Sequence, residues 1–554
     1  MGRMRRPLLA ALALVAIPLV GQPRIPPRAI VNAASFARVG LPNGKIARGS
    51  IFTVFGEDIG PGNPVVVNEF PLGDVLGEIS ITVTQGERTV NAIPLFGNRR
   101  QVNAIMPSDA PLGRSVLRVL VGQTESNPAP IEVVESSFGI FSANGTGLGP
   151  GIVQNFVSPD VQPINSIATV ARRGQLVTLW GTGLGPVDFP DNEAPIPETL
   201  PIDVEIWVGG VPVPRDAILY AGRSPCCAGV DQIIFPIPEQ VPLGCYVPVF
   251  LRTEENSLSN MATMAIAEVD GACDKSSQPF LGGGSFGAAL AAEVDLQLAV
   301  DTPTPTDIEL DIFTGTFRSE SASPFFFNPL LTSIPAGTCA VVSGSGDFIG
   351  GAEIPMTRPS GALLSGAERF TIGGPSGIRQ VSRQPSGPLD YFGILGASLP
   401  DLPLATPFFG TGEHILTAAA GTDLGAIRAT FDLASAPTWI NRDEIGVVDR
   451  ASDLQIEFGG LHFVDSLIGV GGFNYDKAND SATAFYCLTS AGEGAATVPE
   501  WILSALPASS ANPGQSVGVI GLWSQQAPAM FEAEGLDRAA ILALPVVAKT
   551  VIFE

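Results

Sequence analysis

The feature that most constrains this chain is a repeat within its own sequence. Four short blocks recur in the same order, and the offset between the copies grows from 125 residues in the first block to 131 in the second. The blocks are 47–61 with 172–186, 101–107 with 232–238, 110–113 with 241–244, and 126–127 with 259–260. Matched blocks in one order indicate a duplicated structural unit, and the change in offset places a six-residue insertion in the second copy.

Each copy spans about 110 to 120 residues, the size of an immunoglobulin-type sandwich. In the first copy Ile79, Ile81 and Val83 alternate with polar residues, which predicts a half-buried strand. Residues 51–55 are apolar on both faces, which predicts a strand in the middle of a sheet. In the second copy the alternation recurs at residues 204–208, before a Gly-Gly turn.

The composition favours many short strands joined by turns, because the 554 residues include 63 Gly and 49 Pro and are 45% hydrophobic. We therefore expect an all-β protein of tandem immunoglobulin-like β-sandwiches followed by a larger β-rich C-terminal domain. The expected divisions are a signal peptide at 1–21, repeat 1 at 28–136, repeat 2 at 137–274, a linker at 275–289 and the C-terminal domain at 290–554.

The N-terminus has the pattern of a secretory signal peptide. Arg3, Arg5 and Arg6 precede an apolar stretch at 7–20, and cleavage is expected near Gly21. An uncleaved anchor is the alternative. No later run reaches the roughly 20 apolar residues that span a bilayer, so we expect no transmembrane segment in the mature chain. The protein is expected to be exported, either outside the cell or at its surface.

The formal net charge of −24 argues against nucleic acid as a partner, because phosphates require a basic surface. Acidic and amide side chains can hold Ca²⁺, and the candidates are Asn474, Asp476, Asn479 and Asp480 in one loop. These four lack EF-hand spacing, and such residues are ordinary turn formers. No other metal site and no cofactor is expected.

Cysteines in an exported chain favour disulfides over zinc, and no C-x-x-C pair or nearby histidine supports a zinc site. The six are Cys226, Cys227, Cys245, Cys273, Cys339 and Cys487. The first two are adjacent and too constrained to bond each other easily. We therefore expect each of them to pair with Cys245 or Cys273, which leaves Cys339 to pair with Cys487.

The repeated motifs resemble those of a known kind of domain. Gly-x-x-x-Gly-Pro after a β-rich run, at 56–61 and 181–186, resembles the IPT/TIG type of immunoglobulin-like domain. The fuller pattern, with Val-Asn-Ala-Ala-Ser-Phe at 31–36 and Phe-Gly-Ile-Phe at 138–141, resembles an uncharacterised repeat of secreted soil-bacterial proteins. The resemblance covers about residues 28–274. It implies a fold and an exported location, and no catalytic or binding residues. Val153-Gln-Asn155 only loosely echoes Val31-Asn-Ala33, so the first strand of repeat 2 is the least certain.

The C-terminal half also predicts strands, for example at 308–313 and 454–458, with one short helix at 499–506 that begins at a proline. A Cys339–Cys487 bridge would favour a single domain in this half. Two small sandwiches are the alternative.

No convincing catalytic motif is present. Gly283 to Gly287 fits the G-x-S-x-G pattern around Ser285, but it follows a glycine-rich stretch without the strand and helix that a nucleophile elbow requires. His414 and His462, the two histidines, are interpreted as packed or surface residues. Paired carboxylates for glycoside hydrolysis cannot be selected from the sequence.

Two further groups have a structural and a functional interpretation. Asp307, Glu309 and Asp311 share one face of a predicted strand, most simply a solvated face. Phe325–Phe327 and Phe408–Phe409 lie beside prolines, where exposed aromatics would form a binding patch. Burial under a long loop is the interpretation we favour for these phenylalanines.

Together these features predict an exported or cell-surface protein that binds or scaffolds an unknown extracellular protein or polysaccharide and is not an enzyme. A secreted hydrolase with its catalytic site in the C-terminal region is the alternative. A structural component of the envelope without a specific ligand is a third possibility.

Overall fold

In the computed structural model of the protein, the described residues are 22–253, 257–273, 284–299, 305–329, 332–344, 361–384, 390–398, 406–460, 466–509 and 516–554. The expected signal peptide at 1–21 lies outside them. Strands dominate the fold, as predicted, and the α-helix within the described residues is the short α1 (Glu500–Leu503). A helix begins directly after Pro499 as expected, but it ends at Leu503 and not at Leu506.

Repeat 1 is an immunoglobulin-like sandwich. One sheet runs β1 (Ile30–Asn32), β3 (Ile51–Phe55), β8 (Gln101–Ile105), and the other runs β6 (Ile79–Gln85), β9 (Gly113–Val121), β11 (Ala129–Val134), with β2 (Ile46–Ala47) parallel to β11. Strand β7 (Arg88–Gly97) pairs with β8 in the first sheet and with β6 in the second, and its register shifts at Pro94 to Phe96. One strand therefore belongs to both sheets.

Repeat 2 repeats this topology as two separate sheets. The first contains β14 (Val153–Asn155), β15 (Leu176–Thr182), β20 (Asp231–Pro236) and β19 (Tyr220–Arg223), in that order. The second contains β13 (Gly149–Pro150), β22 (Ala262–Ile266), β21 (Gly244–Thr253), β17 (Val204–Val208) and β18 (Val211–Pro212). This arrangement matches the ABED and CFG sheets of immunoglobulin domains.

The predicted strands form where the sequence pattern placed them. The β6 side chains alternate between the core and the surface, and β3 lies between β1 and β8 with four of its five residues buried. The uncertain first strand of repeat 2 is present but shifted by one residue. Asn155 pairs with Val177 as Asn32 pairs with Phe52, so Val153–Asn155 matches Ile30–Asn32 and not Val31–Ala33.

The C-terminal unit is built on one large sheet. Its order is β25 (Cys339–Gly344), β36 (Ser481–Ser490), β35 (Leu467–Asp476), β38 (Ser516–Gln525), β40 (Arg538–Phe553), β23 (Ser285–Leu298), β24 (Thr306–Ser319) and β26 (Ala362–Leu363). A further strand, β29 (Tyr391–Ser398), pairs with β24. Because β23 begins at Ser285, the last five residues of the expected linker at 275–289 belong to this sheet.

Two smaller sheets pack against the large one and create two cores. The sheet of β28 (Gly377–Ser382), β27 (Arg369–Gly374), β30 (Gly412–Ala418) and β31 (Ile427–Leu433) covers the core around Phe313 and Phe370. The sheet of β32 (Thr438–Trp439), β34 (Leu454–Gly459) and β37 (Ala495–Val498) covers a second core around Ile456 and Val470. Strand β40 contributes to both cores. The C-terminal unit is therefore neither a single sandwich nor two separate ones, since one continuous sheet serves two cores.

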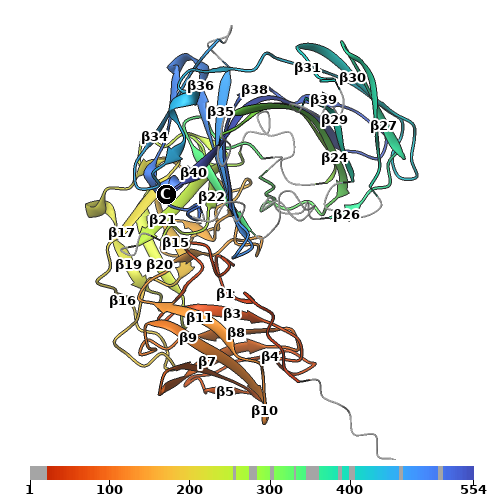
Figure 1. Ribbon diagram of the computed structural model, residues 1–554. Helices are drawn as coiled ribbons and strands as arrows, with labels where there is room; N and C mark the ends of the chain where they lie inside the picture. Colours follow the sequence, from red (N-terminus) through yellow and green to blue (C-terminus); the bar gives the residue numbers. More distant parts are fainter. Residues whose placement is uncertain are drawn as a thin grey trace, which may run out of the picture.

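The three units fold back on one another (Figure 1). Repeat 2 lies between repeat 1 and the C-terminal unit, and the hairpin of β35 and β36 extends down towards repeat 1. At the tip of this hairpin, the Arg28 guanidinium donates to the Ala478 carbonyl at 2.7 Å and lies 3.7 Å from the Asp480 carboxylate. Units at opposite ends of the chain are thus in direct contact.

Candidate functional site

The residues that carry the repeat maintain the sandwich fold. The Asn127 side chain accepts a hydrogen bond from the Ile25 amide at 2.8 Å and donates to the Ile25 carbonyl at 2.9 Å. Asn260 makes the same two bonds to Ile140, at the same distances. In both copies, one amide side chain therefore fixes the incoming chain against the sandwich.

An arginine at equivalent positions in the two repeats, Arg48 and Arg173, binds a backbone carbonyl and a glutamate. Arg48 donates to the Ala110 carbonyl and lies 3.1 Å from Glu135, and Arg173 makes the matching contacts with Val241 and Glu268. A shallow hollow of about 590 Å³ in repeat 2 is lined by Arg173 and Glu268, together with Phe156, Arg172 and Glu239. Because the same ion pair recurs in repeat 1, we assign these charges a structural role.

The repeat joint, the contact between repeats 1 and 2, is polar as well as apolar. The Asn32 side chain donates to the carbonyls of Ser137 and Thr182 at 3.2 and 3.3 Å. The Asp191 carboxylate accepts hydrogen bonds from the Ser108 amide and hydroxyl at 2.7 and 2.8 Å. Burial raises the pKa of Asp191, and these bonds oppose the shift. Side chains from one repeat thus satisfy polar groups of the other.

The insertion in repeat 2 forms part of this joint. It lengthens the loop between β19 and β20, where Cys226 and Cys227 form a disulfide with each other. The expected pairing of these cysteines with Cys245 and Cys273 is therefore wrong. Cys245 instead bonds Cys273, and Cys339 bonds Cys487 as predicted. Cys245 and Cys273 are buried together in one cluster, whereas Cys226 and Cys227 lie in an exposed loop, so the expected pairs do not meet.

A buried ion pair holds the base of this loop. The Arg223 guanidinium lies 3.0 Å from the Asp231 carboxylate, and both side chains are at most 2% exposed. Asp231 also accepts hydrogen bonds from the amides of Gly183 and Leu184, within the Gly-x-x-x-Gly-Pro motif. Burial raises the pKa of Asp231, while Arg223 and these amides oppose the shift.

The C-terminal joint, the contact between repeat 2 and the C-terminal unit, is aromatic. The rings of Trp207 and Trp501 stack with centroids 4.8 Å apart, and Phe250 lies 5.3 Å from Trp501. The Arg252 guanidinium lies over Trp207 and donates to both carboxylate oxygens of Glu500, at 2.8 and 2.9 Å. The short helix α1 supplies Trp501 and Glu500, so its function is to dock the C-terminal unit onto repeat 2.

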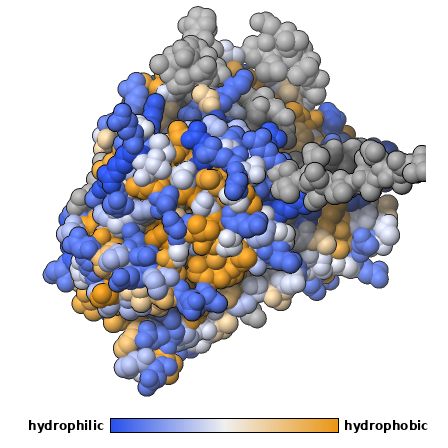
Figure 2. Space-filling model, turned by 90° about the horizontal axis from the view of Figure 1, so that it is seen from below, coloured by the Kyte–Doolittle hydropathy of each residue, from blue (hydrophilic) through white to orange (hydrophobic). Residues whose placement is uncertain are grey.

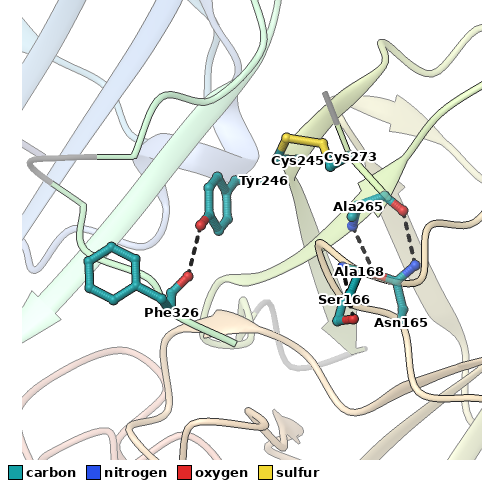
Figure 3. The surroundings of a disulfide bond; sticks show 8 residues. All are labelled: Asn165, Ser166, Ala168, Cys245, Tyr246, Ala265, Cys273 and Phe326. Atoms are coloured by element: carbon teal, nitrogen blue, oxygen red, sulfur yellow. Dashed lines mark hydrogen bonds between the residues drawn. A yellow bond between two sulfur atoms is a disulfide. The ribbon is translucent and has the colours of Figure 1, made fainter. Parts of the chain in front are cut away.

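The first phenylalanine run also contacts repeat 2 (Figure 3). The Tyr246 hydroxyl donates to the Phe326 carbonyl at 2.9 Å, and the Tyr246 and Phe327 rings meet edge to face. The disulfide between Cys245 and Cys273 lies beside Tyr246. Phe326 is buried, as are Phe408 and Phe409 of the second run. Burial of these three is thus confirmed, and the aromatics contribute to packing.

Three of the four calcium candidates lie at the hairpin tip that contacts repeat 1. The Asp476 carboxylate accepts hydrogen bonds from the amides of Ala478 and Asn479 and from the Asn479 side chain. Asn474 is buried on the strand and donates to the Pro507 carbonyl, apart from the turn. Asp480 faces Arg28. Within the described residues, no group of three or more His, Cys, Asp and Glu side chains is arranged to hold a metal ion.

Several carboxylates lie on the β23–β24 hairpin of the C-terminal unit. Glu293 is directly opposite Asp311 on the β23–β24 hairpin. Asp311 is only 2% exposed and accepts hydrogen bonds from the amides of Phe408 and Phe409, so the expectation of a solvated face is wrong for this residue. Asp307 and Glu309 are exposed as expected. Burial raises the pKa of Glu293, and Asp311 and Glu309 raise it further.

His414 is sealed inside the neighbouring core. It is 0% exposed, stacks on Phe431 at 5.2 Å, and its Nδ1 lies 2.9 Å from the Gly412 carbonyl oxygen. Burial lowers its pKa. The packed interpretation of His414 is confirmed, whereas His462 lies outside the described residues. Ser285 begins a strand and donates to Ser319, so the G-x-S-x-G motif forms no nucleophile elbow.

Apolar side chains also occupy the surface. On the face of the molecule seen from below in Figure 1, they form a patch bordered by hydrophilic residues (Figure 2). In repeat 1 the side chains of Phe55, Val66, Phe70, Val75 and Leu112 are exposed. On the C-terminal unit, Phe392 and Ile394 share one face of β29 and are 45% and 59% exposed. Among the described residues, no helix is long and apolar enough to cross a membrane.

Comparisons with known proteins place the chain in no family. No protein-family model matches the sequence, and no curated protein matches it. Solved structures with some similarity include the plexin A4 extracellular region, at 15% identity and a TM-score of 0.16. The match covers 43% of this chain and 18% of the plexin chain.

Two others match most of the chain. Domains 4–9 of the surface layer protein SbsC are 10% identical over 95% of this chain and 65% of that one, with a TM-score of 0.17. SGBP-B of the Bacteroides ovatus mixed-linkage glucan utilization locus is 12% identical, with a TM-score of 0.13, and the match covers 86% of this chain and 92% of SGBP-B. The fold assignment rests on the strand order of the chain itself, which is that of tandem immunoglobulin-like β-sandwiches followed by a larger β-rich unit.

Proposed function

We propose that this protein is an exported, disulfide-stabilised scaffold that holds its modules in one fixed arrangement to bind an extracellular protein or a polysaccharide. The observation that carries the proposal is the C-terminal joint, where Trp207, Trp501 and Phe250 pack together beside the Arg252–Glu500 ion pair. Flexibly linked domains do not need such a contact, since their interfaces are typically small and polar. The modules resemble IPT/TIG-type domains, and that resemblance supports the proposal.

Two further contacts support a fixed arrangement. The repeat joint contains side-chain hydrogen bonds in both directions, and the hairpin tip contacts repeat 1 at Arg28. Each of the three disulfides lies within a single unit and stabilises that unit. Disulfides are typical of oxidising compartments, which supports export. A scaffold needs relative positions that do not change with thermal motion, and these contacts supply them.

Small-angle X-ray scattering of the full chain tests the fixed arrangement. We expect one compact particle in solution and a larger radius of gyration for Trp501→Ala, because the substitution removes the stacked ring at the C-terminal joint. Trp180→Ala is the matched control, since Trp180 lies in repeat 2 and hydrogen bonds to Gln154, away from that joint. A wild-type curve that requires many module orientations would contradict the proposal.

Binding is tested by co-sedimentation of the full chain with insoluble cellulose, chitin and peptidoglycan, and by surface plasmon resonance against purified envelope proteins. Retention on one material and not on the others supports a specific scaffold. Equal failure on all of them, with the fixed arrangement intact, would favour a structural envelope component.

A secreted hydrolase remains the second candidate, and one observation favours it. Glu293 faces Asp311 across the hairpin, and its pKa is raised by burial and by neighbouring carboxylates, as a general acid requires. Release of soluble sugar from any of the polysaccharides, abolished by Glu293→Gln, would establish this function. Under our proposal no sugar is released by either protein.

A further inference from the structure

The three disulfides differ in their access to solvent. Cys245, Cys273, Cys339 and Cys487 are buried, with exposures of 4%, 6%, 8% and 5%. Cys226 and Cys227 are both exposed. Thiol–disulfide exchange requires a thiolate to approach a sulfur atom, so access decides which bond reacts. Only one of the three bonds offers that access in the folded protein.

The same loop faces repeat 1 on its other side. Ala228 and Val230 pack against the apolar cluster that includes Ile51 and Ile105 of repeat 1. A side chain on Gly229 would lie 2.7 Å from Ile51, so the backbone of the loop approaches repeat 1 as closely as glycine permits. The reactive sulfurs are therefore one or two residues from the repeat joint.

A hydrogen-bonded chain connects the loop to the central strand of repeat 1. The Gly229 carbonyl accepts a hydrogen bond from the Thr182 hydroxyl at 2.6 Å, and this hydroxyl accepts one from the Ile51 amide at 2.8 Å. The loop ends are fixed by the Ser224 amide, which donates to the Val230 carbonyl, and by the Arg223–Asp231 ion pair. Only the segment between these ends is free to respond to a change at the sulfurs.

We propose that Cys226–Cys227 is a thiol–disulfide exchange site for small-molecule thiols, and that its redox state is transmitted to the repeat joint. A thiolate attacks one sulfur and forms a mixed disulfide, and a second thiol releases the small-molecule disulfide. The net reaction converts one protein disulfide and two thiols into two protein thiols and one small-molecule disulfide. Opening the ring restores rotational freedom to the Cys226–Cys227 segment, which loosens the Gly229 contact.

The first test is differential alkylation of the oxidised full chain. The protein is incubated with graded glutathione, alkylated with N-ethylmaleimide and digested for mass spectrometry. We expect Cys226 and Cys227 to be alkylated first, with the buried cysteines requiring roughly tenfold more glutathione. Alkylation of Cys226 and Cys227 without any reductant, or simultaneous alkylation of all six cysteines, would overturn the exchange site.

The second test is hydrogen exchange of the selectively reduced chain. We expect faster exchange at 50–55, which contains the Ile51 amide, and unchanged exchange at 79–85 in the other sheet of repeat 1. The Cys226→Ser/Cys227→Ser variant lacks the ring and should match the reduced protein without added thiol. Unchanged exchange at 50–55 in both samples would overturn the link to the repeat joint.

Discussion

Asn127 and Asn260 show how much of a sandwich can depend on one side chain. Each pairs with both backbone polar groups of a residue more than 100 positions earlier in the chain. Asn260 donates in addition to the Gly147 carbonyl at 2.8 Å. The repeated Ser-Asn pair in the sequence indicated that these residues matter, but not that they bind the segment of chain that enters each sandwich.

We predict that Asn260→Ala destabilises the protein by about 1–3 kcal/mol, because buried backbone groups of Ile140 lose their partners. Asn127→Ala is the matched variant, and it should cost less because Asn127 makes fewer bonds. Urea denaturation followed by hydrogen exchange of each repeat measures both effects. Equal losses in the two variants would show that the Gly147 bond contributes nothing.

His414 makes a pH-dependent contribution to stability. Burial lowers its pKa below the ordinary value of 6.5, while Asp311 and Asp432 act in the opposite direction. The unfolded chain therefore binds a proton near pH 6.5 that the folded chain does not bind, so stability is lost as the pH falls through 6.5. We expect the thermal midpoint to drop between pH 7.5 and pH 5.5.

The His414→Phe variant isolates this contribution, because phenylalanine can stack on Phe431 without a titratable group. The difference in thermal midpoint between wild type and variant should change with pH across this range. A constant difference would show that His414 is not the group responsible. Glu293, whose raised pKa does not depend on His414, is present in both proteins and cancels in the comparison.

At the scale of elements, equivalent strands of the two repeats have different surroundings. Strand β9 alternates between buried and partly exposed residues, whereas β21 is buried on both faces over most of its length. The second face of β21 is buried because the C-terminal unit covers it, as the contact between Phe250 and Trp501 shows. Aromatic residues on what should be a solvent face were the available signal for this joint.

The Cys245–Cys273 disulfide fixes the end of repeat 2 to strand β21. It closes a loop with a sequence separation of 28 residues, and the Cys273 amide donates to the Ile167 carbonyl at 2.8 Å. We predict that Cys245→Ser/Cys273→Ser destabilises repeat 2 by ~3–4 kcal/mol. Repeat 1, which has no cysteine, should keep its stability.

Hydrogen exchange resolved by repeat measures this difference. Loss of protection in β15 and β20 with unchanged protection in β6 and β9 is the expected result. If protection in repeat 1 falls equally, the two repeats unfold as one unit and the disulfide stabilises both.

At the scale of the whole molecule, the hairpin tip closes the arrangement between the first and last units. The Arg28–Asp480 pair is partly exposed, with side-chain exposures of 28% and 47%, so its contribution is about 0–1 kcal/mol. We predict that Arg28→Ala and Asp480→Asn each weaken this contact slightly. Arg28→Ala should weaken it more, because it also removes the bond to the Ala478 carbonyl, and the double variant should be no weaker than Arg28→Ala alone. Scattering and urea denaturation of the three variants measure the coupling, and fully additive losses would show that the two side chains act independently.

The sequence predicted the fold class, many of the strands and the burial of Phe326, Phe408 and Phe409, because periodicity and local turns specify these features. It could not predict that Asp311 is buried, since that depends on the amides of Phe408 and Phe409, nearly 100 residues away. It also could not place Trp501 against Trp207. The arrangement of the three units depends on contacts between their surfaces, and no periodic pattern in the sequence marks the residues that form these contacts.

Strand β40 has a consequence for the time course of folding. It pairs in parallel with β23 over residues separated by about 250 positions, and it also pairs with β38. Until β40 pairs with them, β23 and β38 each have an unpaired backbone edge. Both cores also lack the side chains that β40 contributes. Non-local pairing of this kind is slow. The newly made chain must therefore be kept from other chains during this interval, so the yield of native protein should fall steeply as its concentration during refolding rises.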